Sequence, residues 1–212
     1  MKNKTSHRQI FIFSALIFIL LFLIYAFWIP SSQIFWKTIH TTSDGNILFT
    51  FDDGPGPETS LIVETLKTNN KTAIFFVVCE HIQSEEKILL KNISDSGFEI
   101  GLHGKTHSLN EDYNSLKECK DILENITGAQ VKYYRPPYGF KAPRTMNAAK
   151  ELNMTIVLWS IFPRDYNAKN SSIIVKRVER KIEPGAIICM HDGPENREKT
   201  AESLKLILNF EN

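Results

Sequence analysis

Residues 10–29 form an almost uninterrupted apolar run, IFIFSALIFILLFLIYAFWI, in which Ser14 is the one clearly polar side chain. No charged residue lies between Arg8 and Lys37. A 20-residue helix with a rise of ~1.5 Å per residue is ~30 Å long, which matches the hydrocarbon core of a bilayer. A buried core helix is a poor alternative, because the run has no polar face. The run therefore predicts one transmembrane helix over residues 10–29.

A cleavable signal peptide is the main rival interpretation of this run. Signal peptides have apolar regions of only about 7–15 residues and end at a small-residue cleavage site. This run is longer, and it ends in the sequence FWIP. Positive charges favour the cytoplasmic side of a span, so residues 1–9, with Lys2, Lys4 and Arg8, form the expected cytoplasmic tail. We expect an uncleaved signal anchor in the cell membrane, single-pass, with the rest of the chain extracytoplasmic.

The rest of the chain has the length of one globular domain. Residues 30–45 are interpreted as a polar linker and residues 46–212 as the domain, close to the ~150 residues typical of one. The whole chain carries a net charge of +1, and from Lys37 onward acidic residues slightly outnumber basic ones. This balance excludes nucleic acid as an expected partner, because such binding needs a broad basic surface. No obligate protein partner is evident from the sequence.

Short β-rich runs alternate with helical segments along this domain. The expected strands are 47–51, 72–78, 98–101, 131–134, 154–159 and 185–190. The expected helices lie near 58–69, 84–95, 112–126, 143–152, 171–182 and 197–209. Several strands are continuous apolar runs, which is typical of parallel strands buried on both faces. The alternation predicts an α/β domain with a mostly parallel sheet, either open and doubly wound or a small or incomplete barrel.

Polar residues gather where these strands end, which in both sheet alternatives is where sites form. Asp52 and Asp53 follow the first strand in TFDDGP, a motif that taken alone is equally a turn with an Asp cap. His103 and His107 follow the third strand, and a four-residue spacing lets two imidazoles bind one metal ion. Two imidazoles and one carboxylate leave a ligand position open, as catalytic zinc sites do.

Two further strand ends contribute an arginine and a histidine. Arg135 begins the sequence RPPYG, in which two prolines restrict the loop. His191 ends the last strand in MHDG. Because carboxylate, imidazole and guanidinium groups converge from separate strand ends, coincidence is a poor explanation and we expect a functional site at this edge.

Taken together, the four motifs resemble those of a known family. The segments 50–55 (TFDDGP), 103–107 (HGKTH), 135–139 (RPPYG) and 190–191 (MH) look like the signature motifs of polysaccharide deacetylases, the NodB-homology domains of carbohydrate esterase family four. The resemblance covers about residues 45–210. It implies an α/β fold that is a distorted, incomplete (β/α) barrel of the NodB-homology type, here preceded by one N-terminal transmembrane helix.

The same resemblance implies the catalytic groups. Asp53, His103 and His107 would hold a divalent metal, most often zinc, with cobalt or another divalent ion as alternatives. Asp52 would be the general base that takes a proton from the attacking water, and His191 the general acid that protonates the leaving amine.

Further residues would support these groups. The resemblance implies that Arg135 orients Asp52 and that Asp165 tethers either Arg135 or the acid histidine. The backbone N–H of Tyr138 would help to bind the oxyanion, with Pro137 and Gly139 beside it in the substrate loop.

The implied activity is that of a hydrolase acting on carbon–nitrogen amide bonds. Its substrate would be an N-acetylglucosamine-containing polysaccharide of the cell envelope or exterior: peptidoglycan, a chitin-like polymer or an exopolysaccharide. Two alternatives stay open. One is a deformylase or deacetylase of a lipid-linked sugar, which tethering at the bilayer favours, and the other is an inactive glycan-binding homologue.

The sequence departs from the usual family pattern at five positions. Gly104 and Ser108 stand where Ser or Thr and Pro are common, and Phe162, Tyr166 and Cys189 stand where Asp, Trp and Leu are common. None removes an implied ligand, base or acid. Gly104 removes a hydroxyl group that could brace the histidine loop, while Phe162 and Tyr166 alter the groove wall, where substrate preference is set.

Three cysteines are too few for a disulfide framework. Cys79 and Cys189 lie in apolar runs and are expected to be buried, whereas Cys119 lies in a helical pattern that allows exposure. One oxidised pair is compatible with an exported domain, but the spacing does not identify it.

Overall fold

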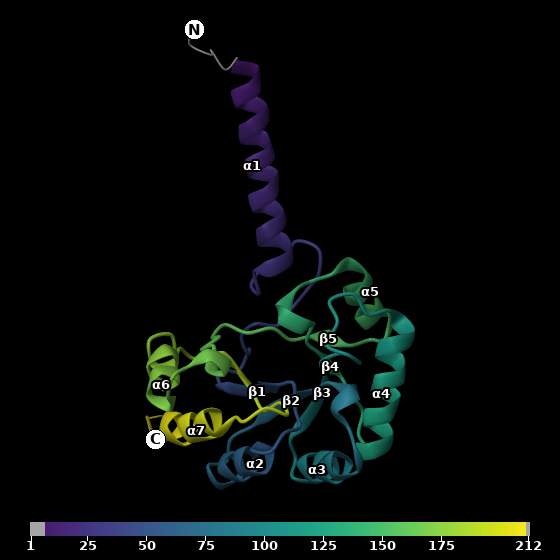
Figure 1. Ribbon diagram of the computed structural model, residues 1–212, viewed down its shortest axis with the longest axis vertical. Coiled ribbons are helices and arrows are strands. Elements are labelled where there is room, and N and C mark those ends of the chain that lie inside the picture. The colour runs from purple at the N-terminus through teal and green to yellow at the C-terminus, as the bar shows by residue number, and fades with distance from the viewer. Residues whose placement is uncertain (1–6, 211–212) are drawn as a thin grey trace.

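The computed structural model describes residues 7–210, so Lys2 and Lys4 of the expected cytoplasmic tail lie outside the described residues. Helix α1, His7–Trp28, contains nearly all of the predicted span and stands out from the globular body (Figure 1). It is the one helix among residues 7–210 that is long and apolar enough to cross a membrane, and only 6% of its most apolar stretch is buried.

A six-stranded parallel sheet forms the centre of the globular body, with the strand order β5-β4-β3-β2-β1-β6. Its strands are β1 (Leu48–Asp52), β2 (Ala73–Val77), β3 (Glu99–Leu102), β4 (Tyr133–Tyr134), β5 (Thr155–Ile156) and β6 (Ile187–His191). The helices α2 (Thr59–Thr68), α3 (Ser84–Asp95), α4 (Tyr113–Thr127), α5 (Pro143–Glu151), α6 (Ser171–Glu179) and α7 (Glu198–Phe210) surround it (Figure 1). Single 3-10 turns lie at η1 (Cys79–His81), η2 (Pro137–Gly139) and η3 (Asp165–Asn167).

The two edges of this sheet are joined by segments outside the named strands. Ile161, beyond β5, forms a parallel bridge to Ile188 of β6. Ile39 bridges to Val157 next to β5, and Thr41 bridges to Ala186 next to β6. The sheet is therefore curled into an incomplete barrel rather than open and flat, which confirms the barrel alternative.

The last two strands before β6 are shorter than the sequence predicts. The runs 131–134 and 154–159 yield only two ladder residues each, in β4 and β5. The backbone N–H of Val157 still donates to the carbonyl oxygen of Tyr134 in β4, but that of Leu158 donates to the carbonyl oxygen of Ile39 instead. The shortening follows from barrel closure, which no local pattern encodes.

Strand parity separates the main apolar core beneath the helices from a barrel interior that holds both polar groups and a small apolar cluster. The outer-facing Phe49, Phe51 and Phe75 belong to the main core beneath the helices, and the rings of Phe51 and Phe75 stack with centroids 5.2 Å apart. Thr50 and Asp52 have the opposite parity in β1 and pair in register with Cys189 and His191 of β6. Because side chains alternate between the faces of a strand, these polar groups all point into the barrel.

A disulfide joins Cys79 in η1 to Cys119 in α4, and Cys189 is free and buried. Cys119 has no exposed surface, so exposure at this position is a wrong expectation. Its helix turns this side chain inward, toward η1 and the loop that follows β3.

The C-terminal end of α1 is docked on the globular body through Lys141. The Lys141 ammonium is buried and donates hydrogen bonds to the carbonyl oxygens of Ile29 (2.8 Å) and Ser32 (3.0 Å). Its backbone N–H donates to the carbonyl oxygen of Phe27 (3.0 Å), and the ring of Phe140 lies 6.2 Å from that of Phe27. Burial lowers the pKa of Lys141. These bonds satisfy carbonyl groups that a helix end otherwise leaves unpaired.

We predict that Lys141→Met destabilises the protein by about 1–3 kcal/mol, because the apolar chain removes the ammonium donor from the buried carbonyl groups of Ser32 and Ile29, and Ile29 keeps only the N–H of Ser32. Urea unfolding of the full chain in detergent measures the effect. Lys150→Met, at an exposed position of α5, is the matched control and should change stability little. Equal losses in the two variants would contradict the docking role of Lys141.

Candidate functional site

The carboxyl ends of β1, β3 and β6, with the loop after β4, enclose a cleft of about 440 Å³. Its lining combines titratable groups with aromatic rings: Asp52, Asp53, His103, His107, Tyr138, Trp159, Phe162, Tyr166, His191, Glu195 and Arg197. The structure thus brings together most residues singled out from the sequence. The remaining polar ones, Arg135 and Asp165, are buried behind the cleft.

Arg135 is fully buried and occupies the barrel interior. Its Nη1 donates to Asp52 Oδ1 at 2.7 Å and to Thr50 Oγ1 at 2.8 Å. Its Nε and Nη2 donate to the carbonyl oxygens of Val157 and Leu158 at 3.0 and 3.1 Å. A planar guanidinium with several donors can satisfy such a set at once, which a lysine cannot.

The space for this guanidinium is set by β2 and β3. The Arg135 Cζ lies 4.2 Å from the ring centroid of Phe76. A Cβ atom on Gly101 would lie 2.5 Å from that ring, so glycine is required at this position of β3. The ring therefore lies flat beneath the cation, a cation–π arrangement that favours the charged group in the interior.

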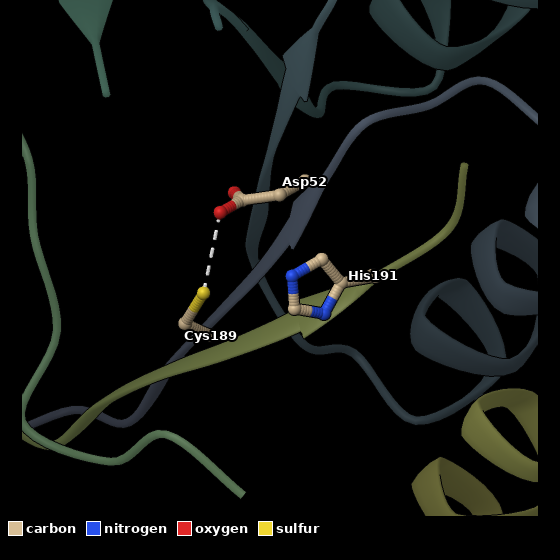
Figure 2. Close-up of side chains that lie close together, drawn as sticks. All are labelled: Asp52, Cys189 and His191. Carbon is tan, nitrogen blue, oxygen red and sulfur yellow. Dashed lines mark hydrogen bonds between the residues drawn. The ribbon is translucent and has the colours of Figure 1, made fainter. Parts of the chain in front are cut away.

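Asp52 lies at the end of β1 and is 3% exposed. Burial alone raises its pKa, but the charges of Arg135, His103 and His191 outweigh burial and hold the pKa of Asp52 below its ordinary value. The thiol of Cys189 donates to Asp52 Oδ2 at 3.3 Å, as Figure 2 shows. One carboxylate oxygen is thus bound by Arg135, and the other faces the cleft between a thiol and an imidazole.

Asp53, His103 and His107 form a cluster with the composition of a metal site. Asp53 Oδ1 lies 3.4 Å from His103 Nε2 and 3.3 Å from His107 Nε2. Among residues 7–210 this oxygen has no hydrogen-bond partner, although it is buried. The three donor atoms lie within 4.8 Å of one another. A divalent ion would give this orphaned oxygen a partner, so the residues fit a cation that takes imidazole and carboxylate ligands.

The hydrogen bond of His103 and the lowered pKa of His107 both favour a metal site. His103 Nδ1 lies 2.8 Å from the carbonyl oxygen of Arg135, which only accepts, so Nδ1 carries a proton and it is Nε2 that presents the lone pair in the neutral ring. Burial is the main cause that lowers the pKa of His107, and it favours the neutral imidazole. Asp53 and His107 both have positive φ, 70° and 56°, so the backbone is strained where the cluster forms.

His191 is held by Asp165. Asp165 accepts from the backbone N–H of His191 at 2.8 Å and from its Nδ1 at 2.7 Å, and from Thr200 Oγ1 at 2.7 Å. Burial alone lowers the pKa of His191, but the hydrogen bond and charge of Asp165 outweigh it and raise that pKa. Conversely, burial raises the pKa of Asp165, and His191 brings it below its ordinary value. The implied tether is therefore found on the histidine, not on Arg135.

The substrate loop from the sequence analysis, Pro137–Gly139, forms η2 at the rim of the cleft. Tyr138 has φ 58°, and its exposed ring lies 4.7 Å from that of His107. Gly139 has φ 68°, and a Cβ atom there would lie 2.6 Å from the Trp159 ring. The loop is consequently fixed between a histidine of the metal cluster and the aromatic wall of the cleft.

That wall consists of Trp159 and of two residues at which the sequence departs from the family pattern, Phe162 and Tyr166. The rings of Trp159 and Phe162 stack 5.0 Å apart. The Phe162 and Tyr166 rings lie 5.9 and 5.3 Å from His191. Phe162 and Tyr166 therefore give the cleft a continuous apolar face next to His191.

Sequence reasoning missed several residues of this region, among them His81 and Asp192. His81 Nδ1 donates to the backbone carbonyl oxygen of Asp53 at 3.0 Å, and its place soon after β2, another strand end, is the signal that could have found it. Asp192 is buried, accepts from Thr59 Oγ1 at 2.6 Å, and lies where a Cβ atom on Gly54 would collide. Burial raises the pKa of Asp192 to about 7.

The sequence profile of the polysaccharide deacetylases matches residues 40–157. The chain belongs to this family. Among relatives, a peptidoglycan-N-acetylglucosamine deacetylase of Bacillus cereus is 30% identical over 187 residues, which cover 84% of this chain and 86% of that protein. The peptidoglycan-N-acetylmuramic acid deacetylase PdaC of Bacillus subtilis is 32% identical over 153 residues, which cover 69% of this chain but only 32% of PdaC.

Solved structures agree on the fold of this polysaccharide deacetylase family member. The Bc1960 peptidoglycan N-acetylglucosamine deacetylase is 29% identical, with a TM-score of 0.75 over 82% of this chain and 85% of that chain. A mutant of BA3943, described as a CE4 family pseudoenzyme with restored enzymatic activity, is 26% identical, with a TM-score of 0.74 over 82% and 65%. The fold is therefore shared by active and inactive proteins.

We predict that Asp165→Asn lowers the pKa of His191 in the metal-free protein, because the burial that depresses it is then no longer opposed by a carboxylate. NMR titration of the imidazole signals in the presence of a chelator measures the pKa. Asp95→Asn, on the exposed end of α3, should leave it unchanged. A His191 pKa that stays raised in Asp165→Asn would contradict this account.

Proposed function

We propose that the protein is a metal-dependent N-deacetylase that hydrolyses the acetamido groups of an N-acetylglucosamine-containing polysaccharide. The observation that carries the proposal is the meeting, in one cleft, of the Asp53–His103–His107 cluster with two further groups, the Arg135-bound Asp52 and the Asp165-bound His191. Membership of the polysaccharide deacetylase family and the deacetylase activities for which the relatives are named support the same reaction class.

Asp53, His103 and His107 would hold the divalent ion, for which we propose zinc, with cobalt or another divalent ion as alternatives. When bound, such an ion acts as a Lewis acid that makes water more acidic and stabilises the negative charge of an acyl-transfer transition state. The fixed Nδ1 proton of His103 and the lowered pKa of His107 both keep imidazole nitrogen available for this role.

Asp52 acts as the general base in this proposal. Its lowered pKa keeps it ionised at neutral pH, so it can accept a proton from the water that attacks the acetamido carbonyl. Arg135 holds Oδ1, and this leaves Oδ2 as the oxygen that accepts the proton. Arg135 is thus a positioning residue, because it acts through Asp52.

His191 acts as the general acid. Asp165 binds Nδ1 and raises the pKa, so Nε2 can carry the proton that the leaving amine needs. The backbone N–H of Tyr138 assists the oxyanion, with Pro137 and Gly139 setting the strained turn that presents it. The rings of the aromatic wall offer an apolar surface for the faces of sugar rings.

The test is acetate release by the full chain in detergent from peptidoglycan, chitin oligomers and lipid-linked sugars. Asp52→Asn should reduce the rate by ~10²–10⁴-fold, as expected for loss of a general base. A chelator should abolish release and added zinc should restore it. Asp121→Asn, an exposed surface carboxylate of α4, is the matched control and should leave the rate unchanged.

Each outcome separates the alternatives. Undiminished release by Asp52→Asn would overturn the base assignment. Release from lipid-linked sugars alone would favour an enzyme of membrane-bound precursors. Glycan binding without release from any substrate would favour the inactive homologue, the category to which BA3943 is assigned.

We also propose that the protein is anchored in the cell membrane. Residues 1–9 would be cytoplasmic, residues 10–29 would lie in the bilayer, and the linker 30–45 would lead to the extracytoplasmic catalytic domain 46–212. The exposure of α1 along nearly its whole length and its apolar composition support this arrangement.

The anchor predicts a specific fractionation behaviour. The protein should stay in the membrane pellet after a high-salt wash and dissolve only in detergent, because a 20-residue apolar span is held by the hydrophobic effect and not by charge. N-terminal sequencing of the mature protein is the second measurement. A mature chain that starts near residue 30 would show a cleaved signal peptide instead.

A further inference from the structure

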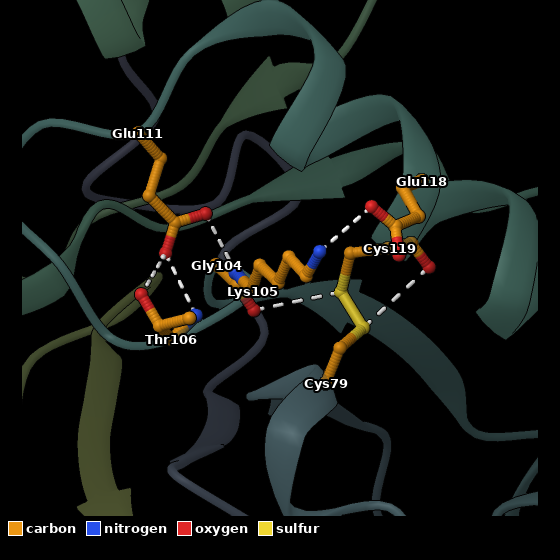
Figure 3. The surroundings of a disulfide bond; sticks show 7 residues. All are labelled: Cys79, Gly104, Lys105, Thr106, Glu111, Glu118 and Cys119. Atoms are coloured by element: carbon orange, nitrogen blue, oxygen red, sulfur yellow. Dashed lines mark hydrogen bonds and ion pairs between the residues drawn. A yellow bond between two sulfur atoms is a disulfide. The ribbon is translucent and has the colours of Figure 1, made fainter.

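Glu111 is a buried carboxylate that the proposed mechanism does not use. It lies between β3 and α4, directly after the loop that carries His103 and His107. Its Oε2 accepts from the backbone N–H of Lys105 at 2.6 Å, and its Oε1 accepts from that of Thr106 at 2.9 Å (Figure 3). One side chain therefore binds successive N–H groups of residues 103–107, which we name the metal loop.

Backbone N–H groups of η1 donate hydrogen bonds to the carbonyl groups of the metal loop. The backbone N–H of Cys79 donates to the carbonyl oxygen of Gly104 at 3.1 Å, and that of Glu80 donates to the carbonyl oxygen of Lys105 at 3.0 Å. The disulfide joins η1 to α4 directly beside these bonds, and Cys119 Sγ lies 3.5 Å from the Gly104 carbonyl oxygen (Figure 3). Both polar edges of the loop backbone are thus fixed by groups outside it.

Gly104 leaves the space that the carboxylate of Glu111 occupies. It has φ +107°, and a Cβ atom there would lie 2.7 Å from Glu111 Oε1. The hydroxyl residue common in the family at this position therefore has no room here, and Glu111 supplies the brace that the missing hydroxyl would give. The loop ends at His107, whose positive φ is strained and has to be held by surrounding contacts.

We propose that Glu111, supported by the Cys79–Cys119 disulfide, is a positioning residue that sets the geometry of His103 and His107 for metal binding. Gly104 and Glu111 form a matched pair in which the glycine makes space for the carboxylate. The inference rests on the proposed metal site and assigns to it Glu111, Cys79 and Cys119, which lie outside the signature motifs.

The decisive variant is Glu111→Gln, which keeps shape and volume but turns one acceptor oxygen into an amide donor that faces a backbone N–H. We expect zinc affinity, measured by competition with a chromophoric chelator, to fall about 10–100-fold, the range found for residues that orient metal ligands. Glu118→Gln is the matched control, because Glu118 binds the side chain of Lys105 and not the loop backbone. It should bind zinc as the unaltered protein does.

Three further measurements test the positioning role, and the first of them is made on the folded protein. Amide hydrogen exchange at Lys105 and Thr106 should accelerate in folded Glu111→Gln, with exchange in the core strands unchanged. The paired change Cys79→Ala with Cys119→Ala should also weaken zinc binding. Gly104→Ala and Glu111→Ala should each lower zinc affinity. In the double variant the fold-loss of affinity should be smaller than the product of the two single fold-losses, because Glu111→Ala removes the carboxylate with which the new Cβ atom at position 104 would collide.

The outcomes distinguish this inference from the proposed function. Unchanged zinc affinity and unchanged loop exchange in Glu111→Gln would overturn the positioning role, even if the protein is less stable. Absence of zinc binding by the unaltered protein in the same titration would contradict the metal site itself.

Discussion

The buried ion pair between Arg135 and Asp52 organises the interior of this barrel. The guanidinium joins the loop after β4 to the end of β1, and it also binds the carbonyl groups that follow β5. A buried pair contributes little to stability by itself, but removing either partner leaves an uncompensated charge that costs about 3–5 kcal/mol. The pair therefore constrains the fold and the protonation of Asp52 together, so the strands cannot shift without disturbing the site.

Much of the fold was predictable because the necessary information is local. Continuous apolar runs mark β1, β2 and β6, and helical periodicity places α3 at the range the sequence predicts, Ser84–Asp95. The lengths of β4 and β5 were not predictable. They depend on bridges from Ile39 and Ile161, which lie far from their partners in sequence or outside any strand pattern. Barrel closure depends on contacts between residues far apart in sequence, and the local hydrophobic periodicity contains no information about such contacts.

In the candidate site, too, residues within local motifs could be predicted from the sequence, and residues that act through long-range contacts could not. Asp52, Asp53, His103 and His191 were visible because each stands at a strand end inside a recognisable motif. Glu111 was not, because its role consists of contacts with backbone N–H groups, which leave no side-chain pattern in the sequence. The pairing of the cysteines was hidden for a related reason. It requires knowing that η1 and α4 meet over the loop between them.

The bridges of Ile39 and Thr41 have a consequence for how the globular body could be separated from its helix. These residues lie in the gap between the two edges of the curled sheet, beside Val157 and Ala186. Shedding by a protease that cuts before Ile39 would release a body whose gap is still filled. A cut after Thr41 would leave both edges with unpaired backbone groups, which are templates for aggregation. The segment that follows the apolar helix therefore also closes the barrel, because it fills the space between the two edges of the sheet.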